Sequence, residues 1–99
     1  MEISQIPAHE WEHWVKENDA VVLDVREPFE WELGTLPGAV KIRLADLPSS
    51  LESLDPARPT LVVCRSGGRS LQAAAFLAMS GFDKAANMAG GMHALGMQA

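Results

Sequence analysis

The sequence of 99 residues has a single cysteine, Cys64, and this scarcity limits the chemistry that the chain can hold. One cysteine cannot form an internal disulfide, and it cannot supply the several thiolates of a structural zinc site. A lone cysteine is either a small buried apolar residue or a reactive group, and its sequence neighbours decide between the two.

Long apolar segments and targeting signals are also missing. No run approaches the roughly 18–20 apolar residues of a membrane-spanning helix. The first residues, MEISQIPAHEWEHW, are acidic and interrupted by polar side chains. They lack the basic and apolar regions of a secretion signal. We therefore expect a cytoplasmic protein that does not act at a membrane.

Basic side chains are few, and the formal net charge is -5. Phosphate binding favours a basic face, so the composition argues against nucleic acid as a partner. One exception is local: Arg65 and Arg69 flank the cysteine loop, and no acidic residue occurs between Thr60 and Phe82. A positive spot on an acidic protein predicts a small anionic ligand.

The hydrophobic content of 47% allows one core, and glycine and proline form no linker-like block, so we expect one domain over residues 1–99. Hydrophobic periodicity and turn residues predict helices over residues 7–18, 27–33, 46–54, 69–80 and 92–98. They predict strands over residues 20–25, 39–42, 60–64 and 85–88. Strands that alternate with helices indicate an α/β fold with a mostly parallel sheet covered on both faces.

Residues 60–79, TLVVCRSGGRSLQAAAFLAM, predict a strand, a tight loop and a helix, with Cys64 at the end of the strand. Gly67 and Gly68 permit positive φ, so that successive backbone N–H groups can converge on one point. The helix adds free N–H groups and the positive end of its dipole, and Arg65 and Arg69 add full charges. We expect these features to hold the pKa of Cys64 below its usual ~8.5 and to make a nucleophile without a histidine base.

The alternative interpretation of Cys64 is structural. In that case the cysteine is a buried spacer at a strand end, and the glycines form an ordinary turn between a strand and a helix. We favour the reactive cysteine because two glycines and two arginines accompany it in one short loop before a strong helix.

The loop C-R-S-G-G-R-S, from Cys64 to Ser70, resembles the active-site loop of rhodanese-homology domains, a family of sulfurtransferases. Residues 23–27 (LDVRE), Glu30-Trp31 and residues 34–39 (GTLPGA) resemble the family's block D-V-R-E…E-(aromatic)…G-H-I-P-G-A. Gly90-Gly91-Met92 resembles its closing turn. These three motifs occur in the family's order, and the resemblance extends over nearly the whole chain.

The resemblance implies a rhodanese-like fold, with a mainly parallel five-stranded sheet flanked by helices on both faces. It also implies persulfide chemistry at Cys64. The thiolate would take sulfur from a small anionic donor such as thiosulfate and pass it to an external thiol, a protein acceptor or cyanide. No metal and no organic cofactor is implied.

Substrate-binding roles follow from the same resemblance for the loop residues Arg65, Ser66, Gly67, Gly68, Arg69 and Ser70. Their backbone N–H groups would cradle the outer sulfur, and the hydroxyl of Ser66 or Ser70 could add a hydrogen bond. The two arginines would orient the anionic donor. We expect Arg69 to matter more than Arg65, because Arg69 closes the loop at the start of the helix and Arg65 can point outward.

Two positions depart from the family pattern. Thr35 stands where the family usually has histidine, and Leu95 or a near neighbour stands where it usually has tryptophan. We interpret both as packing positions, which affect local stability more than chemistry.

Two other functions remain open. A cysteine phosphatase or arsenate reductase of the related loop type places arginine six positions after cysteine, whereas Arg69 comes five positions after Cys64 and Ser70 follows it. The shorter loop suits one extra sulfur atom better than a tetrahedral phosphoryl group. A persulfide carrier or partner-binding module without turnover has the same loop, so the sequence does not separate it from an enzyme.

Several charged and aromatic residues outside the loop invite a functional role. We interpret Asp24 and Arg26, at the end of a buried strand, as structural support through an ion pair, because unpaired buried charges are costly. His9 and His13 lack a third metal ligand, and we treat His93 as a surface residue. The tryptophans Trp11, Trp14 and Trp31 are expected to pack in or near the core.

Overall fold

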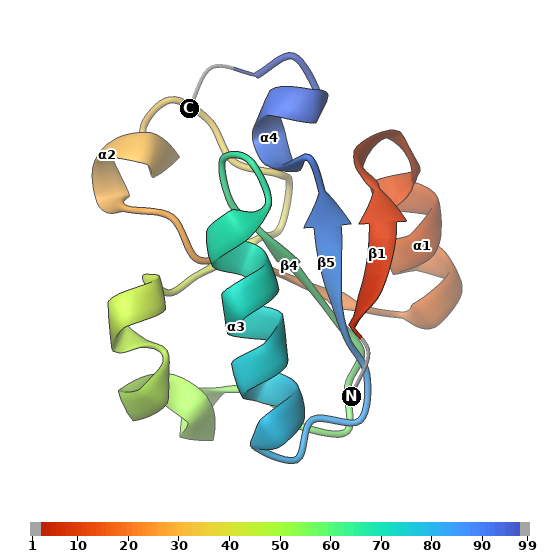
Figure 1. Cartoon of the computed structure of the whole chain (residues 1–99), viewed down its shortest axis with the longest axis vertical. Coiled ribbons are helices and arrows are strands. Elements are labelled where there is room, and N and C mark those ends of the chain that lie inside the picture. Colours follow the sequence, from red (N-terminus) through yellow and green to blue (C-terminus); the bar gives the residue numbers. More distant parts are fainter. Residues whose placement is uncertain (1–2, 98–99) are drawn as a thin grey trace.

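The computed structural model describes residues 3–97, and a five-stranded parallel sheet forms its centre (Figure 1). The strands lie in the order β1-β5-β4-β2-β3, and every neighbouring pair runs parallel. Their bounds are β1 Ser4–Pro7, β2 Val21–Asp24, β3 Val40–Lys41, β4 Thr60–Val63 and β5 Ala85–Ala89. The α-helices are α1 Trp11–Asn18, α2 Pro28–Trp31, α3 Gly68–Met79 and α4 Gly91–Ala94.

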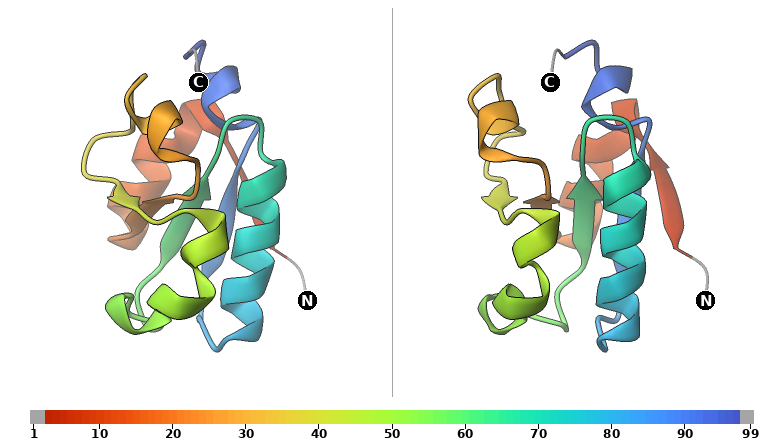
Figure 2. Two further views of the ribbon diagram at one scale, coloured as in Figure 1. Left: turned by 90° about the vertical axis from the view of Figure 1, so that its left-hand side faces the viewer. Right: turned by 60° about the vertical axis from the view of Figure 1, so that its left-hand side comes forward.

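Three 3-10 segments complete the chain: η1 Ala8–Glu10, η2 Leu44–Asp46 and η3 Pro48–Ser53. Helix α3 and the η2 and η3 segments lie on one face of the sheet, and α1 and α4 lie on the other (Figure 2). Parallel strands need crossover connections, and these helices provide them while covering both faces.

Two apolar layers hold the sheet between the helices. On the α3 side, Leu23, Val25 and Val62 pack against Ala73 and Leu77. On the opposite side, buried residues of the sheet such as Leu61 and Val63 pack with Met92 and Leu36, against which Trp11, Trp14 and Leu95 lie half-buried. Successive residues of a strand belong to opposite layers, because their side chains point to opposite faces of the sheet.

The predicted fold class is confirmed, since the sheet is parallel, five-stranded and covered on both faces. The strand β1 differs from the prediction, which placed a helix from Pro7 and no strand before it. Its sequence SQIP is short and largely exposed at the sheet edge, so it has no apolar run or alternation to indicate a strand. Residues 46–54 were predicted as a helix and form 3-10 turns instead.

The remaining boundaries shift by a few residues. The helix predicted over residues 92–98 starts at Gly91 and ends at Ala94, and Gln98 lies outside the described residues. Within residues 3–97, no helix has the length and apolar character needed to cross a membrane.

The sheet topology determines where the chain can place a site. Strands β2 and β4 are neighbours, and Asp24 and Val63 are register partners at their carboxyl ends. The segments that follow these two ends are Val25–Arg26 and the loop from Cys64. In open parallel sheets, ligands bind beyond the carboxyl ends of the strands. Cys64 therefore lies at the edge of the sheet where a site is expected.

Candidate active site

Cys64 follows β4 directly, and its loop leads into helix α3. The side chain is 1% exposed and belongs to the apolar layer under α3. Gly67 precedes the helix with φ of +104°, a conformation that residues with a Cβ rarely adopt. An added Cβ there would also lie 3.3 Å from the backbone nitrogen of Gly90. The chain therefore turns sharply at Gly67, and the loop closes around the cysteine sulfur.

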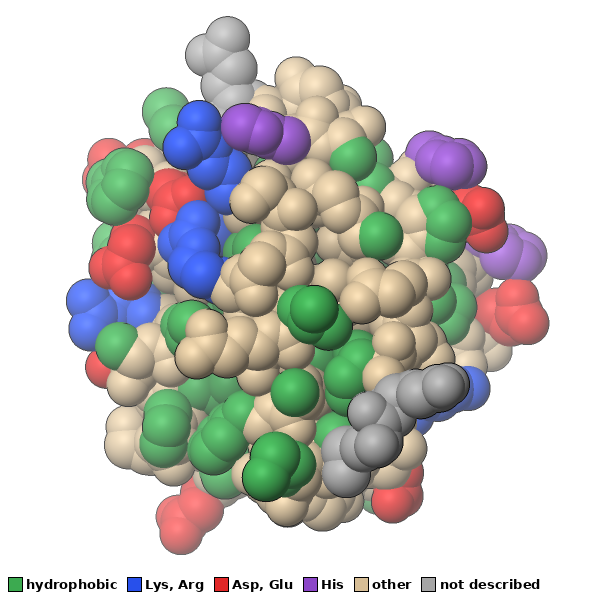
Figure 3. Space-filling model, in the orientation of Figure 1, with side chains coloured by type: hydrophobic (Ala, Val, Ile, Leu, Met, Phe, Trp, Pro, Cys, Tyr) green, Lys and Arg blue, Asp and Glu red, His purple; other side chains and the backbone are tan. Residues whose placement is uncertain are grey.

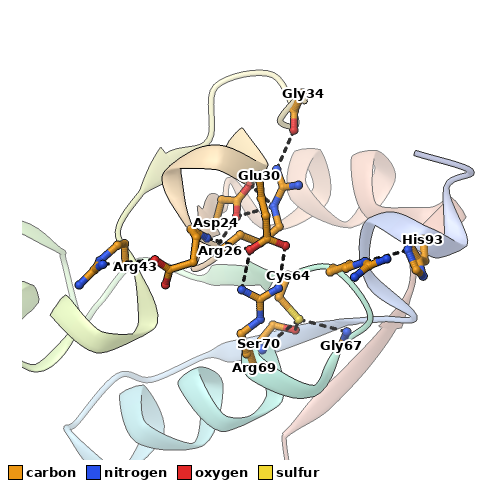
Figure 4. Close-up of polar contacts among 12 residues, drawn as sticks. Asp24, Arg26, Glu30, Gly34, Arg43, Cys64, Gly67, Arg69, Ser70 and His93 are labelled. Carbon is orange, nitrogen blue, oxygen red and sulfur yellow. Dashed lines mark hydrogen bonds and ion pairs between the residues drawn. The ribbon is translucent and has the colours of Figure 1, made fainter. Parts of the chain in front are cut away.

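Three groups contact the sulfur from the loop and the first turn of α3 (Figure 4). The backbone N–H of Gly67 donates to Sγ at 3.1 Å, and the backbone N–H of Ser70 donates at 3.3 Å. The hydroxyl of Ser70 lies 3.2 Å from Sγ. Ser70 thus takes the hydroxyl position that the sequence left open between Ser66 and Ser70, and Ser66 is exposed.

These contacts outweigh the effect of burial on the cysteine. Burial alone raises the pKa of the Cys64 thiol, because it disfavours the charged form. A thiolate at this position would be stabilised by the Ser70 hydroxyl and by the backbone N–H groups of Ser70, Gly67 and Ser66. These groups lower the pKa, and the net shift of the pKa is downward. The loop is therefore built to favour a thiolate, the nucleophilic form of cysteine.

The second glycine pair, Gly90-Gly91, supports this loop from behind. The backbone N–H of Met92 donates to the carbonyl of Cys64 at 2.9 Å, and that of His93 donates to the carbonyl of Arg65 at 2.9 Å. A Cβ on Gly91 would lie 2.5 Å from the Arg65 carbonyl oxygen, so only glycine allows this approach. In a trans peptide the N–H points away from the C=O. Because α4 holds the Arg65 carbonyl, the N–H of Ser66 is turned toward the sulfur.

Arg69 does not present a free positive charge. Its Nη1 and Nη2 atoms donate to the two carboxylate oxygens of Glu30 at 2.7 and 2.8 Å. Glu30 is 4% exposed, and its Oε1 also accepts the backbone N–H of Glu27, which caps α2. The hydrogen bond with Arg69 is the largest influence on Glu30 and lowers its pKa from 4.5 to about 2, although burial acts in the opposite direction. The same pairing raises the pKa of Arg69.

The other arginine of the loop, Arg65, forms no ion pair with a carboxylate among residues 3–97. It is exposed, and its Nε donates to Nε2 of His93 at 3.0 Å. An accepting Nε2 belongs to a neutral imidazole, which orients the guanidinium without cancelling its charge. At the end of the molecule toward which β1 and β5 point, basic side chains lie beside a histidine and several acidic groups (Figure 3).

Asp24 and Arg26 form a buried pair beneath α2. Both side chains are fully buried, and Arg26 Nη2 donates to Asp24 Oδ2 at 2.7 Å and to the carbonyl of Gly34 at 2.7 Å. Arg26 thereby ties the end of β2 to the segment that follows α2. This contact fixes the position of α2, from which Glu30 reaches Arg69.

Comparisons with known proteins bear on this arrangement. The family model of the rhodanese-like domain matches residues 7–98. The chain belongs to the rhodanese-like domain family. The resemblance seen in the three sequence motifs is thus confirmed, and the site described above is the loop of a rhodanese-like domain.

Relatives of this rhodanese-like domain include proteins named as sulfurtransferases. "Putative sulfurtransferase YtwF" of Bacillus subtilis (strain 168) is 38% identical over 95 residues, which cover 95% of this chain and 91% of that protein. A sulfurtransferase of Allochromatium vinosum is 33% identical over 74 residues, or 75% of this chain and 69% of that protein. Other relatives are longer, and the chain spans 28% of one and 31% of another.

The solved structure of a rhodanese-like domain protein from Staphylococcus aureus is similar over most of its length. It superposes with a TM-score of 0.87 at 30% identity, covering 98% of this chain and 95% of that one. The fold is therefore the rhodanese fold.

The structure brings some of the predicted site residues to the sulfur and leaves others apart. Gly67 and Ser70 contact Sγ, and Arg69 lies close enough for the Cys64 charge to raise its pKa. Arg65, Ser66 and Gly68 are exposed. Gly68 is the first residue of α3 and lacks a positive φ, so of the two adjacent glycines only Gly67 uses that freedom.

Two residues that contribute to the site were not predicted. Glu30 comes from α2 and neutralises Arg69, and Asn87 on β5 contacts the Ser70 hydroxyl. A signal for Asn87 exists in the sequence AANMA, where one polar side chain interrupts a buried strand and must find a partner. Glu30 was visible only as a member of a family motif.

The remaining candidates lie away from the loop. The side chains of His9 and His13 are each 80% exposed, and their nearest acidic groups are Glu10 and Glu17. Among residues 3–97, no three His, Cys, Asp or Glu side chains gather as a metal site would require. Hollows of about 260 and 300 Å³ lie near Phe82 and between η2 and α3, and neither is lined by Cys64.

Proposed function

We propose that the protein is a sulfurtransferase that carries sulfane sulfur on Cys64 as a persulfide. The donor is a small anion such as thiosulfate, and the acceptor is a thiol or cyanide. The observation that carries the proposal is the set of three hydrogen-bonding groups at Cys64 Sγ, two backbone N–H groups and one hydroxyl. Relatives named as sulfurtransferases support it.

The first half-reaction uses the thiolate that the loop favours. The Cys64 thiolate attacks the outer sulfur of thiosulfate, an S–S bond forms to Cys64, and the S–S bond of the donor breaks. Sulfite leaves with the electron pair of that bond. The outer sulfur now carries the negative charge. Backbone N–H groups that point toward the centre of the loop stabilise that charge.

The second half-reaction restores the enzyme. An acceptor thiolate or cyanide attacks the outer sulfur, and Cys64 leaves as the thiolate. With one cysteine in the chain, no second thiol can release the sulfur as an internal disulfide. The acceptor is therefore an external molecule, either a small thiol or the thiol of a partner protein.

Arg65 and Arg69 divide the work at the loop. Arg65 is exposed and uncompensated, so it attracts the anionic donor. Arg69 is bound to Glu30 and holds α2 against the start of α3. The near-complete burial of Cys64 favours a donor small enough to enter between these elements.

The test is the intact mass of the protein after incubation with thiosulfate, with the Cys64→Ser variant treated in parallel. We expect a gain of one sulfur atom on the wild-type chain, reversed by cyanide or by a thiol and absent from the variant. A gain that persists in Cys64→Ser would overturn the assignment to this residue. No gain at neutral pH would exclude thiosulfate as an efficient donor.

A second measurement separates an enzyme from a carrier. Steady-state thiocyanate formation from thiosulfate and cyanide reports turnover, whereas a single stoichiometric transfer reports a carrier. Robust hydrolysis of an aryl phosphate that is lost in Cys64→Ala would contradict both and favour a phosphatase.

A further inference from the structure

A row of hydrogen-bonding side chains leads from the cysteine sulfur to the surface of the outer strand β1. The Ser70 hydroxyl lies 3.2 Å from Cys64 Sγ and also contacts Oδ1 of Asn87. The Nδ2 of Asn87 donates to Oε1 of Gln5 at 2.9 Å. Asn87 and Gln5 are register partners on the parallel strands β5 and β1. The row therefore starts at a buried sulfur and ends at an exposed carboxamide.

The Ser70 hydroxyl has a single proton, and this limits what its neighbours can do. In the structure that proton is directed to Asn87 Oδ1. Ser70 Oγ can then only accept a hydrogen bond from Cys64, which must be the neutral thiol. This arrangement therefore suits the protonated cysteine.

A thiolate needs the opposite arrangement. Ser70 must donate its proton to the sulfur, and its oxygen is then free to accept a hydrogen bond from Asn87. For this the carboxamide of Asn87 must turn so that Nδ2 faces Ser70 and Oδ1 faces Gln5. Gln5 must turn in the same way and donate through its own nitrogen.

We propose that Asn87 and Gln5 form a reversible carboxamide relay that sets the direction of the Ser70 hydroxyl and thereby the ionisation of Cys64. Both arrangements keep one hydrogen bond at each contact of the row, because a half turn of a carboxamide exchanges its oxygen and nitrogen with little change of shape. No proton moves along the row. The thiol proton leaves to solvent, and only the hydroxyl and the two carboxamides turn.

The two carboxamides differ in burial and therefore in their freedom to rotate. Asn87 is 3% exposed, and a buried carboxamide without partners is costly, so its orientation must follow its neighbours. Gln5 is exposed and can exchange its contacts with water. Asn87 and Gln5 are positioning residues, since they act on the sulfur only through Ser70. The relay rests on the proposed function for its catalytic meaning, but its readout does not need sulfur transfer.

The charged surroundings of Cys64 are common to both arrangements. They comprise Asp24 at the end of β2, Arg26 after it, Glu30 on α2, Arg65 in the loop, Arg69 on α3, and His93 on α4. Asp24 pairs with Arg26, and Glu30 pairs with Arg69. Arg65 stays charged in both arrangements of the row. The relay therefore acts as an addition to a fixed electrostatic background.

The test replaces the exposed end of the row, because a change at buried Asn87 endangers the fold itself. An ionised glutamate only accepts hydrogen bonds and favours the thiol arrangement, whereas lysine only donates and favours the thiolate arrangement. We expect Gln5→Glu to raise the pKa of Cys64 and Gln5→Lys to lower it, with a gap of about 0.5–1 pH unit between them. The measurement is the ultraviolet absorbance of the thiolate against pH, repeated with the rate of alkylation by iodoacetamide.

A charge acting through space shifts the pKa in the same directions, so a control must separate the two. In a Ser70→Ala background the charges at position 5 remain but the hydroxyl is gone. The relay predicts that the gap collapses there, and an unchanged gap, or no gap in the wild-type background, overturns the relay.

A salt series keeps the test decisive if Ser70→Ala folds poorly. Raising the salt from 0.1 to 1 M shortens the screening length from roughly 10 to roughly 3 Å and weakens a through-space gap, because the charge at position 5 is exposed to solvent. A relay gap persists, and a gap that disappears with salt refutes it. If the gap is present but thiosulfate adds no sulfur to Cys64, the relay stands and the proposed donor fails.

Discussion

Arg65 and Arg69 lie at the two ends of one loop, and their environments differ. Arg65 is exposed and donates to a neutral histidine, so its charge is available to an incoming anion. Arg69 donates through two nitrogens to Glu30, a carboxylate that is 4% exposed, so its charge is already balanced. The comparison teaches that the number of arginines in a loop does not give the positive charge that is available to a ligand. It also predicts that the two residues fail in different ways.

Replacing Arg69 by alanine has the largest expected effect. It leaves the buried carboxylate of Glu30 without its partner, and we expect a loss of roughly 1–3 kcal/mol in the free energy of unfolding, less than for a fully buried pair because Arg69 is partly exposed. The measurement is urea denaturation, together with kcat/KM for thiosulfate, which should also fall. The double variant Glu30→Gln/Arg69→Ala should recover part of the stability. Equal stability of Arg69→Ala and the wild-type protein would contradict the role of the pair.

Acid should weaken the same ion pair by protonating Glu30, without a mutation at Arg69. Because the pKa of Glu30 lies at about 2 in the folded chain against 4.5 ordinarily, its contribution to stability is complete above about pH 4.5. It is lost as the pH falls from there toward 2. We expect the stability difference between wild-type and Glu30→Gln to shrink over this interval, measured by thermal unfolding. A difference that stays constant down to pH 2 would mean that the carboxylate is not held by Arg69.

Replacing Arg65 by alanine should affect recruitment of the donor and leave folding unchanged. We expect KM for thiosulfate to rise about three- to tenfold at low salt, because one exposed charge is lost, and the effect to fade as salt is added. Initial rates over a range of ionic strength measure it. Arg65→Lys keeps the charge and serves as the control. A loss that does not depend on salt would point to a contact other than charge attraction.

Replacing His93 by leucine should have the smallest effect. The change removes the acceptor of Arg65 Nε but keeps the charge, and one exposed hydrogen bond contributes little. We expect KM for thiosulfate to stay within about twofold of the wild-type value. If His93→Leu were as impaired as Arg65→Ala, the histidine itself would take part in donor binding.

Some parts of this site could be predicted from the sequence because their signals are local. The buried strand before Cys64, the positive φ at Gly67 and the strong helix after it all come from residues within one short segment. The α/β class followed from the alternation of predicted strands and helices, and the rhodanese-like fold followed from the resemblance of three motifs in order. The expectation that Arg69 matters more than Arg65 remains a prediction, and the structure supplies another reason for it in the pair with Glu30.

Other parts were beyond a sequence reading because they depend on contacts between distant residues. Glu30 and Arg69 lie on α2 and α3 and meet only when both are packed at the sheet edge. Strand β1 is defined by its pairing with β5, and its own residues are mostly exposed and too few to show a pattern. Gly90-Gly91 was identified as a turn, but its approach to the backbone of Arg65 requires coordinates.

The two backbone hydrogen bonds from α4 to the loop make the loop's opening observable from another part of the chain. The amide protons of Met92 and His93 are held by the carbonyls of Cys64 and Arg65. Such protons exchange with deuterated water only when the structure around them opens. Their exchange rates therefore give the free energy with which the loop opens, in the absence of substrate and without a label on the cysteine. Hydrogen exchange followed by nuclear magnetic resonance on the resting protein would thus measure how often the loop around Cys64 opens.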